Sequence, residues 1–223
     1  MLTTTNNDRR LNVLVGCEYS GRVREAFRSR GHNAWSCDLL PADDHSTYHY
    51  QFDIVDIIQC RPESDPWDII IMFPECTKLC VSGNRWYGKG MEKHDQRLES
   101  VKWTADLFKL ACRHARYVAM ENPVGVLPKM AGMKATQYIQ PWMFSHPESK
   151  KTGLWLHNLN PLVPTDNVKE LHDSLPRKER MRVHHMSPGE HRWKERSTTY
   201  AGVAKAMGDQ WSKQVTGELA CKV

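Results

Sequence analysis

The chain has 223 residues, of which 40% are hydrophobic and 26% are charged, a composition that excludes wholesale disorder. Its 31 lysines and arginines against 26 aspartates and glutamates give a net charge of +5, which permits a polyanionic partner without requiring one. No apolar run approaches the ~18 residues that a membrane span needs, and residues 1–10 contain no apolar signal core. We therefore expect a soluble, cytoplasmic protein that folds as one domain over 1–223 and has no membrane partner.

Apolar patterns predict strands and helices in alternation along the chain. Strands are expected at 11–16, 33–38, 67–73, 117–120 and 153–156. Helices are expected from Ser20, which can cap the first turn, to Gly31, over 95–116 and over 198–211, the last within a segment 197–223 that completes the core. This alternation predicts an α/β fold with a mostly parallel sheet and helices on both faces.

The seven cysteines are interpreted as free thiols, because an odd number without a secretory signal does not indicate a disulfide framework. Cys76 and Cys80 form a CxxxC pair, but no second pair with zinc-like spacing follows, so no metal site is expected. The stretch 158–196 is rich in proline, histidine and charge, and it is expected to be irregular and exposed.

Two predicted strand ends suggest a nucleoside pocket, because ligands of an open parallel sheet bind at the carboxyl ends of its strands. The segment 16–21 after the first strand has glycines that let backbone approach a ligand, although an ordinary strand-to-helix turn is the more common meaning of such a segment. Asp38, after the second strand, could accept the two hydroxyls of a ribose or cap a loop. Asp53 could accept the amino group of an adenine or be a solvated loop residue.

Two further strand ends carry groups suited to covalent chemistry. Cys76 follows the most apolar strand and would attack as a thiolate, a small buried residue being the alternative. Glu121 follows the next strand and would lie beside Cys76 if the two strands are neighbours, a helix cap being the alternative. A thiol and a carboxyl in one cleft suit attack on a ring with protonation at its opposite edge.

The order of these features, a glycine turn, an aspartate, Pro-x-Cys and Glu-Asn-Pro, resembles the S-adenosylmethionine-dependent cytosine-C5 DNA methyltransferases. The chain is more closely similar to the short, phage-encoded relatives of that family. The segments 76–86, 151–156 and 200–211 are typical of them, and the resemblance spans about residues 11–157 and 196–211.

The resemblance implies a Rossmann-like methyltransferase fold in which Cys76 attacks C6 of the pyrimidine and Glu121 holds N3. S-adenosylmethionine is the implied cofactor, and its expected pocket comprises Gly16, Glu18, Tyr19, Ser20, Gly21, Asp38, Leu39, Asp53, Pro74 and Ser197. The expected contacts to the substrate are Thr77, Ser82, Asn84, Arg85, Asn122, Lys150 and Thr152.

The chain departs from the family's pattern in three ways. Glu75 stands where the family has a second proline, and a carboxylate beside the thiol raises its pKa unless it turns away. Thr152 stands where the family has an arginine that contacts the base. A sizeable target-recognition domain is replaced by the short basic segment 158–196.

The end of that segment is basic, with seven lysines and arginines against three glutamates between Arg177 and Arg196. Together with Trp193 and the nearby histidines it could grip phosphates and a base, or it could be a solvated loop. We expect methyl transfer to C5 of cytosine in DNA with low sequence specificity, because phosphate contacts carry no sequence information. The alternatives are C5 modification of a free pyrimidine nucleotide and a non-catalytic anti-restriction module that binds DNA or cofactor.

Overall fold

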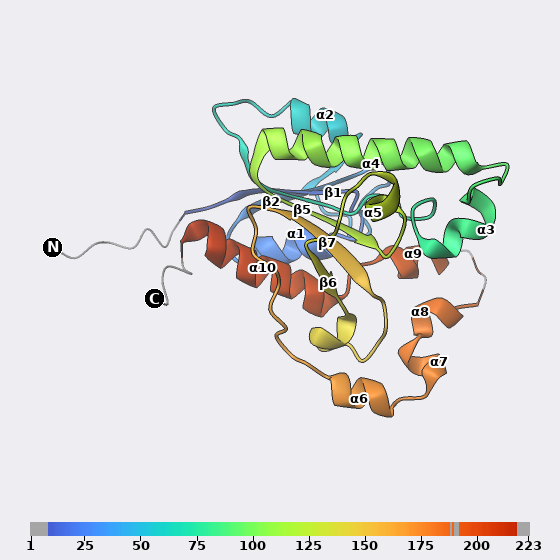
Figure 1. Ribbon diagram of the computed structural model, residues 1–223. Helices are drawn as coiled ribbons and strands as arrows, with labels where there is room; N and C mark the ends of the chain where they lie inside the picture. Colours follow the sequence, from blue (N-terminus) through green and yellow to red (C-terminus); the bar gives the residue numbers. More distant parts are fainter. Residues whose placement is uncertain (1–8, 188, 190–191, 218–223) are drawn as a thin grey trace.

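The computed structural model describes residues 9–187, 189 and 192–217, and its centre is a seven-stranded sheet in the order β3-β2-β1-β4-β5-β7-β6 (Figure 1). The strands are β1 (Asn12–Gly16), β2 (Asn33–Asp38), β3 (His49–Gln51), β4 (Trp67–Met72), β5 (Ala115–Pro123), β6 (Gln137–Ile139) and β7 (Thr152–His157). Strands β1 to β5 pair in parallel, whereas β7 is antiparallel to both β5 and β6. The predicted α/β fold with a mostly parallel, Rossmann-like sheet is confirmed.

The helices lie on both faces of the sheet. They are α1 (Arg22–Arg28), α2 (Ile54–Gln59), α3 (Asn84–Tyr87), α4 (His94–His114), α5 (Leu127–Met130), α6 (Lys169–Ser174), α7 (Arg177–Arg180), α8 (Arg182–His185), α9 (Arg192–Ser197) and α10 (Ala201–Thr216), with short 3-10 turns at Val81–Gly83 and Pro141–Met143. Figure 1 shows α2 and α4 on one face and α1 and α10 on the other.

The core consists of two apolar clusters, one on each face of the sheet. Strand β4 contributes to both, since Ile69 and Ile71 belong to the cluster with Trp211 of α10, while Ile70 belongs to the cluster with Leu107 of α4. All three isoleucines have no exposed surface. This alternation is what a central strand needs when helices cover both faces.

The basic segment 158–196 differs from its prediction, because it carries α6 to α9 rather than being irregular throughout. Apolar side chains anchor it: Leu159 and Leu162 join the core cluster beside α10, and Val183 of α8 is 5% exposed. Its composition is polar on average, but these few buried residues are sufficient to hold short helices against the body of the protein.

The first helix is capped differently from the prediction. The carboxylate of Glu18 accepts hydrogen bonds from the backbone N–H groups of Val23 (2.8 Å) and Arg24 (3.4 Å), whereas Ser20 accepts only a long one of 3.5 Å, from the N–H of Arg22. Gly21 precedes the helix with φ +69°, a left-handed conformation that glycine adopts without strain. At Gly16, a Cβ would lie 2.5 Å from the side chain of Ile54, so this glycine serves packing of α2 against β1.

Candidate active site

A cavity of about 490 Å³ lies at the carboxyl ends of β1, β2 and β4, and the strand order reverses between β1 and β4. Asp38 and Asp53 line it together with exposed apolar side chains of Leu39, Phe52 and Trp103. Burial raises the pKa of the Asp38 carboxyl, and Asp53 also caps α2 by accepting a 2.8 Å bond from the N–H of Val55. A volume of this size with a few polar groups on apolar walls fits a nucleoside.

The predicted cofactor residues divide between two adjoining cavities. Tyr19, Asp38, Leu39, Asp53 and Ser197 line the larger cavity. Glu18, Ser20 and Pro74 line a smaller one of about 90 Å³, which also includes Tyr19 and Ser197. Gly16 and Gly21 line neither cavity: Gly16 makes room for Ile54 of α2, and Gly21 provides the left-handed turn before α1.

The smaller cavity brings Cys76 and Glu121 together. Cys76 follows β4 and Glu121 lies in β5, and these strands are parallel neighbours with Met72 paired to Met120. The two cavities share walls formed by Cys17, Tyr19, Phe73, Glu75 and Ser197. A group held in one cavity therefore lies close to a group held in the other.

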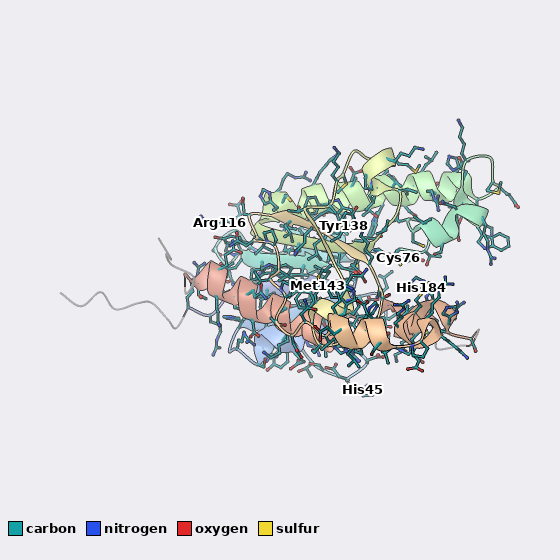
Figure 2. All side chains as sticks on the ribbon, turned by 60° about the horizontal axis from the view of Figure 1, so that its bottom comes forward. His45, Cys76, Arg116, Tyr138, Met143 and His184 are labelled. Carbon is teal, nitrogen blue, oxygen red and sulfur yellow. The ribbon has the colours of Figure 1, made fainter. Side chains whose placement is uncertain are left out.

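Figure 2 shows where this edge of the sheet lies. Cys76 is at the same end of the molecule as His184 of α8, whereas Arg116, at the start of β5, lies at the opposite end. The thiol thus lies at the carboxyl end of the parallel strands, where the residue pattern predicted it.

The pKa of the Cys76 thiol is raised to about 11, chiefly by burial, with smaller contributions from Glu121 and Cys80 in their ionised forms. The positive charges of Lys150 and Arg196 act in the opposite direction. Glu75 is exposed and is not among the groups that shift this thiol. The expected effect on the thiol thus comes from burial and Glu121, and Lys150 and Arg196 are the groups that favour the reactive thiolate.

Burial favours the neutral form of Glu121. Burial raises the pKa of its carboxyl, opposed by the charge of Lys150 and by a hydrogen bond to Thr152. A carboxyl with a raised pKa keeps its proton at a pH where an exposed glutamate has lost it. Glu121 can therefore act as a proton donor beside the thiol.

The predicted substrate residues on β7 and in the loop before it lie at the site. Lys150 lines the smaller cavity and donates a 2.8 Å hydrogen bond to the carbonyl of Arg196. Thr152 lies on β7, where it pairs with Pro123 of β5, and it borders the space between Glu121 and Tyr200. The Thr152 hydroxyl donates a 3.1 Å hydrogen bond to the carbonyl of Lys150, and its nearness to Glu121 lowers the pKa of that carboxyl.

The other predicted substrate residues are placed differently. Thr77, Ser82, Asn84 and Arg85 line neither cavity. Asn84 is committed to the fold, since its side-chain oxygen accepts a 2.7 Å bond from Arg97. Asn122 is 1% exposed and donates a 2.9 Å bond to the carbonyl of Pro74, which ties β5 to the turn that carries Cys76.

Arg97 of α4 is a residue that the sequence interpretation missed. Its side chain is buried, 3% exposed, and donates to the carbonyls of Lys78 (2.6 Å) and Cys80 (3.4 Å) as well as to Asn84. It therefore holds the segment that follows Cys76 against α4. A signal was present, because Arg97 lies four residues before the buried Val101 on the apolar stripe of the helix.

The sequence also did not predict several of the aromatic side chains that line the larger cavity. Phe52 and Trp103 carry no local signal of a cavity, because each belongs to a different element and only folding brings them together. Trp193, which the sequence groups with residues that could grip phosphates and a base, lines the larger cavity.

We expect iodoacetamide to modify Cys76 slowly at pH 7, because the raised pKa leaves little thiolate. Cys60 is exposed at the end of α2 and should react first. The Cys76 rate should rise about tenfold per pH unit below its pKa, as peptide mass spectrometry can follow. Lys150→Met removes a cation that lowers this pKa and should slow the reaction further. Equal modification rates for Cys76 and Cys60 at pH 7 would contradict a raised pKa for the Cys76 thiol.

No helix in the described part of the chain is long and apolar enough to cross a membrane. Among the same residues, no group of three or more histidine, cysteine, aspartate or glutamate side chains could hold a metal ion.

Comparison with known proteins gives likenesses of overall structure. No family model matches the chain, and no curated protein matches it. Among solved structures it is similar to the methyltransferase EhMeth of Entamoeba histolytica, with 18% identity and a TM-score of 0.47 over 72% of this chain and 58% of that one. It is also similar to the Dnmt2 methyltransferase of S. pombe, with 14% identity and a TM-score of 0.42 over 77% and 57%.

A third similar structure is the bifunctional kinase-methyltransferase WbdD, with 14% identity and a TM-score of 0.45 over 70% of this chain and 36% of that one. The chain therefore spans less than two thirds of the length of each of these proteins.

Proposed function

We propose that this protein transfers a methyl group from S-adenosylmethionine to C5 of cytosine in DNA through a covalent adduct with Cys76. The observation that carries the proposal is the pairing of Cys76 with Glu121 in one small cavity that shares walls with a nucleoside-sized one. A nucleophile on one side and a proton donor on the other are what activation of a pyrimidine ring requires.

The larger cavity fits the cofactor by the chemistry of its lining. Asp38, at the end of β2, is positioned to accept the ribose hydroxyls, and Asp53 to accept the amino group of the adenine. Leu39, Phe52 and Trp103 supply apolar surface for the purine. When bound, S-adenosylmethionine supplies the methyl group that C5 accepts.

The residues of the smaller cavity account for activation of the ring. The Cys76 thiolate forms a bond to C6, the electrons of the C5=C6 bond shift through the ring toward N3, and Glu121 gives its proton to N3. The neutral enamine that results is nucleophilic at C5. After C5 has been methylated it loses its hydrogen to solvent as a proton. Those electrons rebuild the C5=C6 bond and expel the sulfur, and N3 returns its proton to Glu121.

Positive charge next to the site supports a polynucleotide substrate. Five cations of the basic segment make no ion pair within the part of the chain that the structure describes, namely Arg177, Lys178, Arg180, Arg192 and Arg196. By contrast, Arg182 pairs with Glu148 at 3.1 Å and Lys194 with Asp43 at 2.5 Å. Cations without a carboxylate partner are available to phosphates, and a base in duplex DNA would have to be flipped out to reach Cys76.

The test supplies labelled S-adenosylmethionine together with cytosine-containing DNA, dCMP or dUMP in parallel reactions. We expect label in DNA, recovered as 5-methyldeoxycytidine when the digested nucleosides are analysed by mass spectrometry. Label in dCMP or dUMP alone would replace DNA by a free nucleotide as the substrate. Methylation of the exocyclic amino group, or no transfer to any of the three, would contradict the proposal.

A further inference from the structure

Helix α9 (Arg192–Ser197) borders both cavities of the site. Trp193 and Ser197 line the larger cavity, whereas Arg196 and Ser197 line the smaller one. Figure 1 shows α9 close to the edge of the sheet where β5 ends. One short helix thus provides a wall for the nucleoside-sized cavity and a cation for the cavity with the thiol.

Polar contacts and one ring contact, between Trp193 and Tyr19, hold this helix in place. The Tyr19 hydroxyl lies 3.2 Å from the carbonyl of Lys194 and 3.0 Å from the hydroxyl of Ser197. Lys194 pairs with Asp43 at 2.5 Å, and Lys150 donates to the carbonyl of Arg196 at 2.8 Å. None of the side chains of α9 is buried. A helix of six residues without buried apolar surface has low stability of its own.

Trp193 is the aromatic side chain of α9, and it lies at the larger cavity with 53% of its surface exposed. Its ring centroid is 5.6 Å from that of Tyr19 at an interplanar angle of 51°, so one face of the indole stays available. A flat ring bound in the cavity would cover this face, and burial of aromatic surface is strongly favourable. Such a ligand would add to α9 the apolar contact that the helix lacks.

We propose that Trp193 binds the cofactor, and that cofactor binding stabilises α9 and thereby strengthens binding of DNA at the smaller cavity. This inference rests on the proposed function, since it takes the larger cavity as the cofactor site. Stabilising α9 fixes Arg196 and, through its carbonyl, Lys150 beside Cys76 and Glu121. The positive charges of Arg196 and Lys150 attract a polyanion. Cofactor binding therefore strengthens DNA binding, and DNA binding strengthens cofactor binding by the same factor.

The first measurement is calorimetric titration with S-adenosylhomocysteine, the product form of the cofactor. Trp193→Ala should bind it about tenfold more weakly than the wild type, and Trp193→Phe, which keeps an aromatic ring, within about twofold. Glu195→Gln is the matched control, because Glu195 lies on the same helix and lines neither cavity, and glutamine can still accept a hydrogen bond from Arg182, which lies 3.5 Å from Glu195. Since no side chain of α9 is buried, these variants should keep the wild-type fold, which circular dichroism checks.

The second measurement is the affinity for a fluorescein-labelled, cytosine-containing duplex, taken by anisotropy with and without saturating S-adenosylhomocysteine. The wild type and Glu195→Gln should bind the duplex about fivefold more tightly with the ligand present, and Trp193→Ala should lose that difference. The inference would be overturned, and the proposed function left intact, by either of two results for Trp193→Ala. One is wild-type affinity for S-adenosylhomocysteine, and the other is a ligand-induced gain in duplex affinity as large as that of the wild type. A wild-type protein that does not bind S-adenosylhomocysteine would overturn both.

Discussion

Replacing Cys76 by serine is expected to abolish methyl transfer to DNA. The hydroxyl is a far weaker nucleophile than the thiolate, and without a bond to C6 the carbon at C5 does not become nucleophilic. Lys150 and Arg196, which favour the thiolate, cannot compensate for the loss of the sulfur. The measurement is transfer of label from S-adenosylmethionine to DNA, compared with the wild-type protein.

The covalent step can be observed directly with DNA that contains 5-fluorocytosine. Fluorine at C5 cannot leave as a proton, so the sulfur is not expelled and the wild-type protein should remain attached to the DNA in a denaturing gel. Cys76→Ser should form no adduct. Cys60→Ser is the matched control, since this cysteine is exposed at the end of α2 and should behave as the wild type. Equal methylation by Cys76→Ser and the wild type would show that the mechanism is wrong.

Replacing Glu121 by glutamine is expected to reduce the methyl-transfer rate by about 10²–10³-fold. Glutamine keeps the size of the side chain and can donate a hydrogen bond, but it cannot give a proton to N3. The carbonyl of Pro74 stays tied to Asn122, so the turn that carries Cys76 should keep its position. The measurement is single-turnover transfer of label to DNA at saturating cofactor.

The pH dependence gives Glu121 a signature that a structural role would not produce. Because burial raises the pKa of this carboxyl, its protonated form persists above the range of an ordinary glutamate and is lost as the pH rises through the raised pKa. The wild-type rate should therefore rise with the Cys76 thiolate and fall as Glu121 ionises. Glu121→Gln should lose the fall, whereas the exposed Glu170→Gln should retain it. An unchanged rate and profile in Glu121→Gln would exclude Glu121 as the acid.

Local patterns in the chain were sufficient to predict the strands that carry the site. The isoleucine run of β4 and the alternation of strands with helices predict a parallel sheet, because buried strands and amphipathic helices have characteristic local periodicities. Since ligands of such sheets bind at the strands' carboxyl ends, the same patterns place Cys76 and Glu121 at one edge. The roles of Gly16 and Gly21 could not be assigned in the same way, because a tight turn has the same sequence pattern whether it approaches a ligand or serves packing.

Folding decided everything that depends on contacts between distant parts of the chain. The pairing of β4 with β5 places the thiol beside the carboxyl, and burial is the largest cause of the raised pKa of both groups. Arg97 reaches the segment after Cys76, and Trp193 the cavity beside Asp38, across long stretches of sequence. Periodicity reports which face of an element is apolar, but not which element packs there, so the sequence predicted the reactive groups and the tertiary structure decided their surroundings.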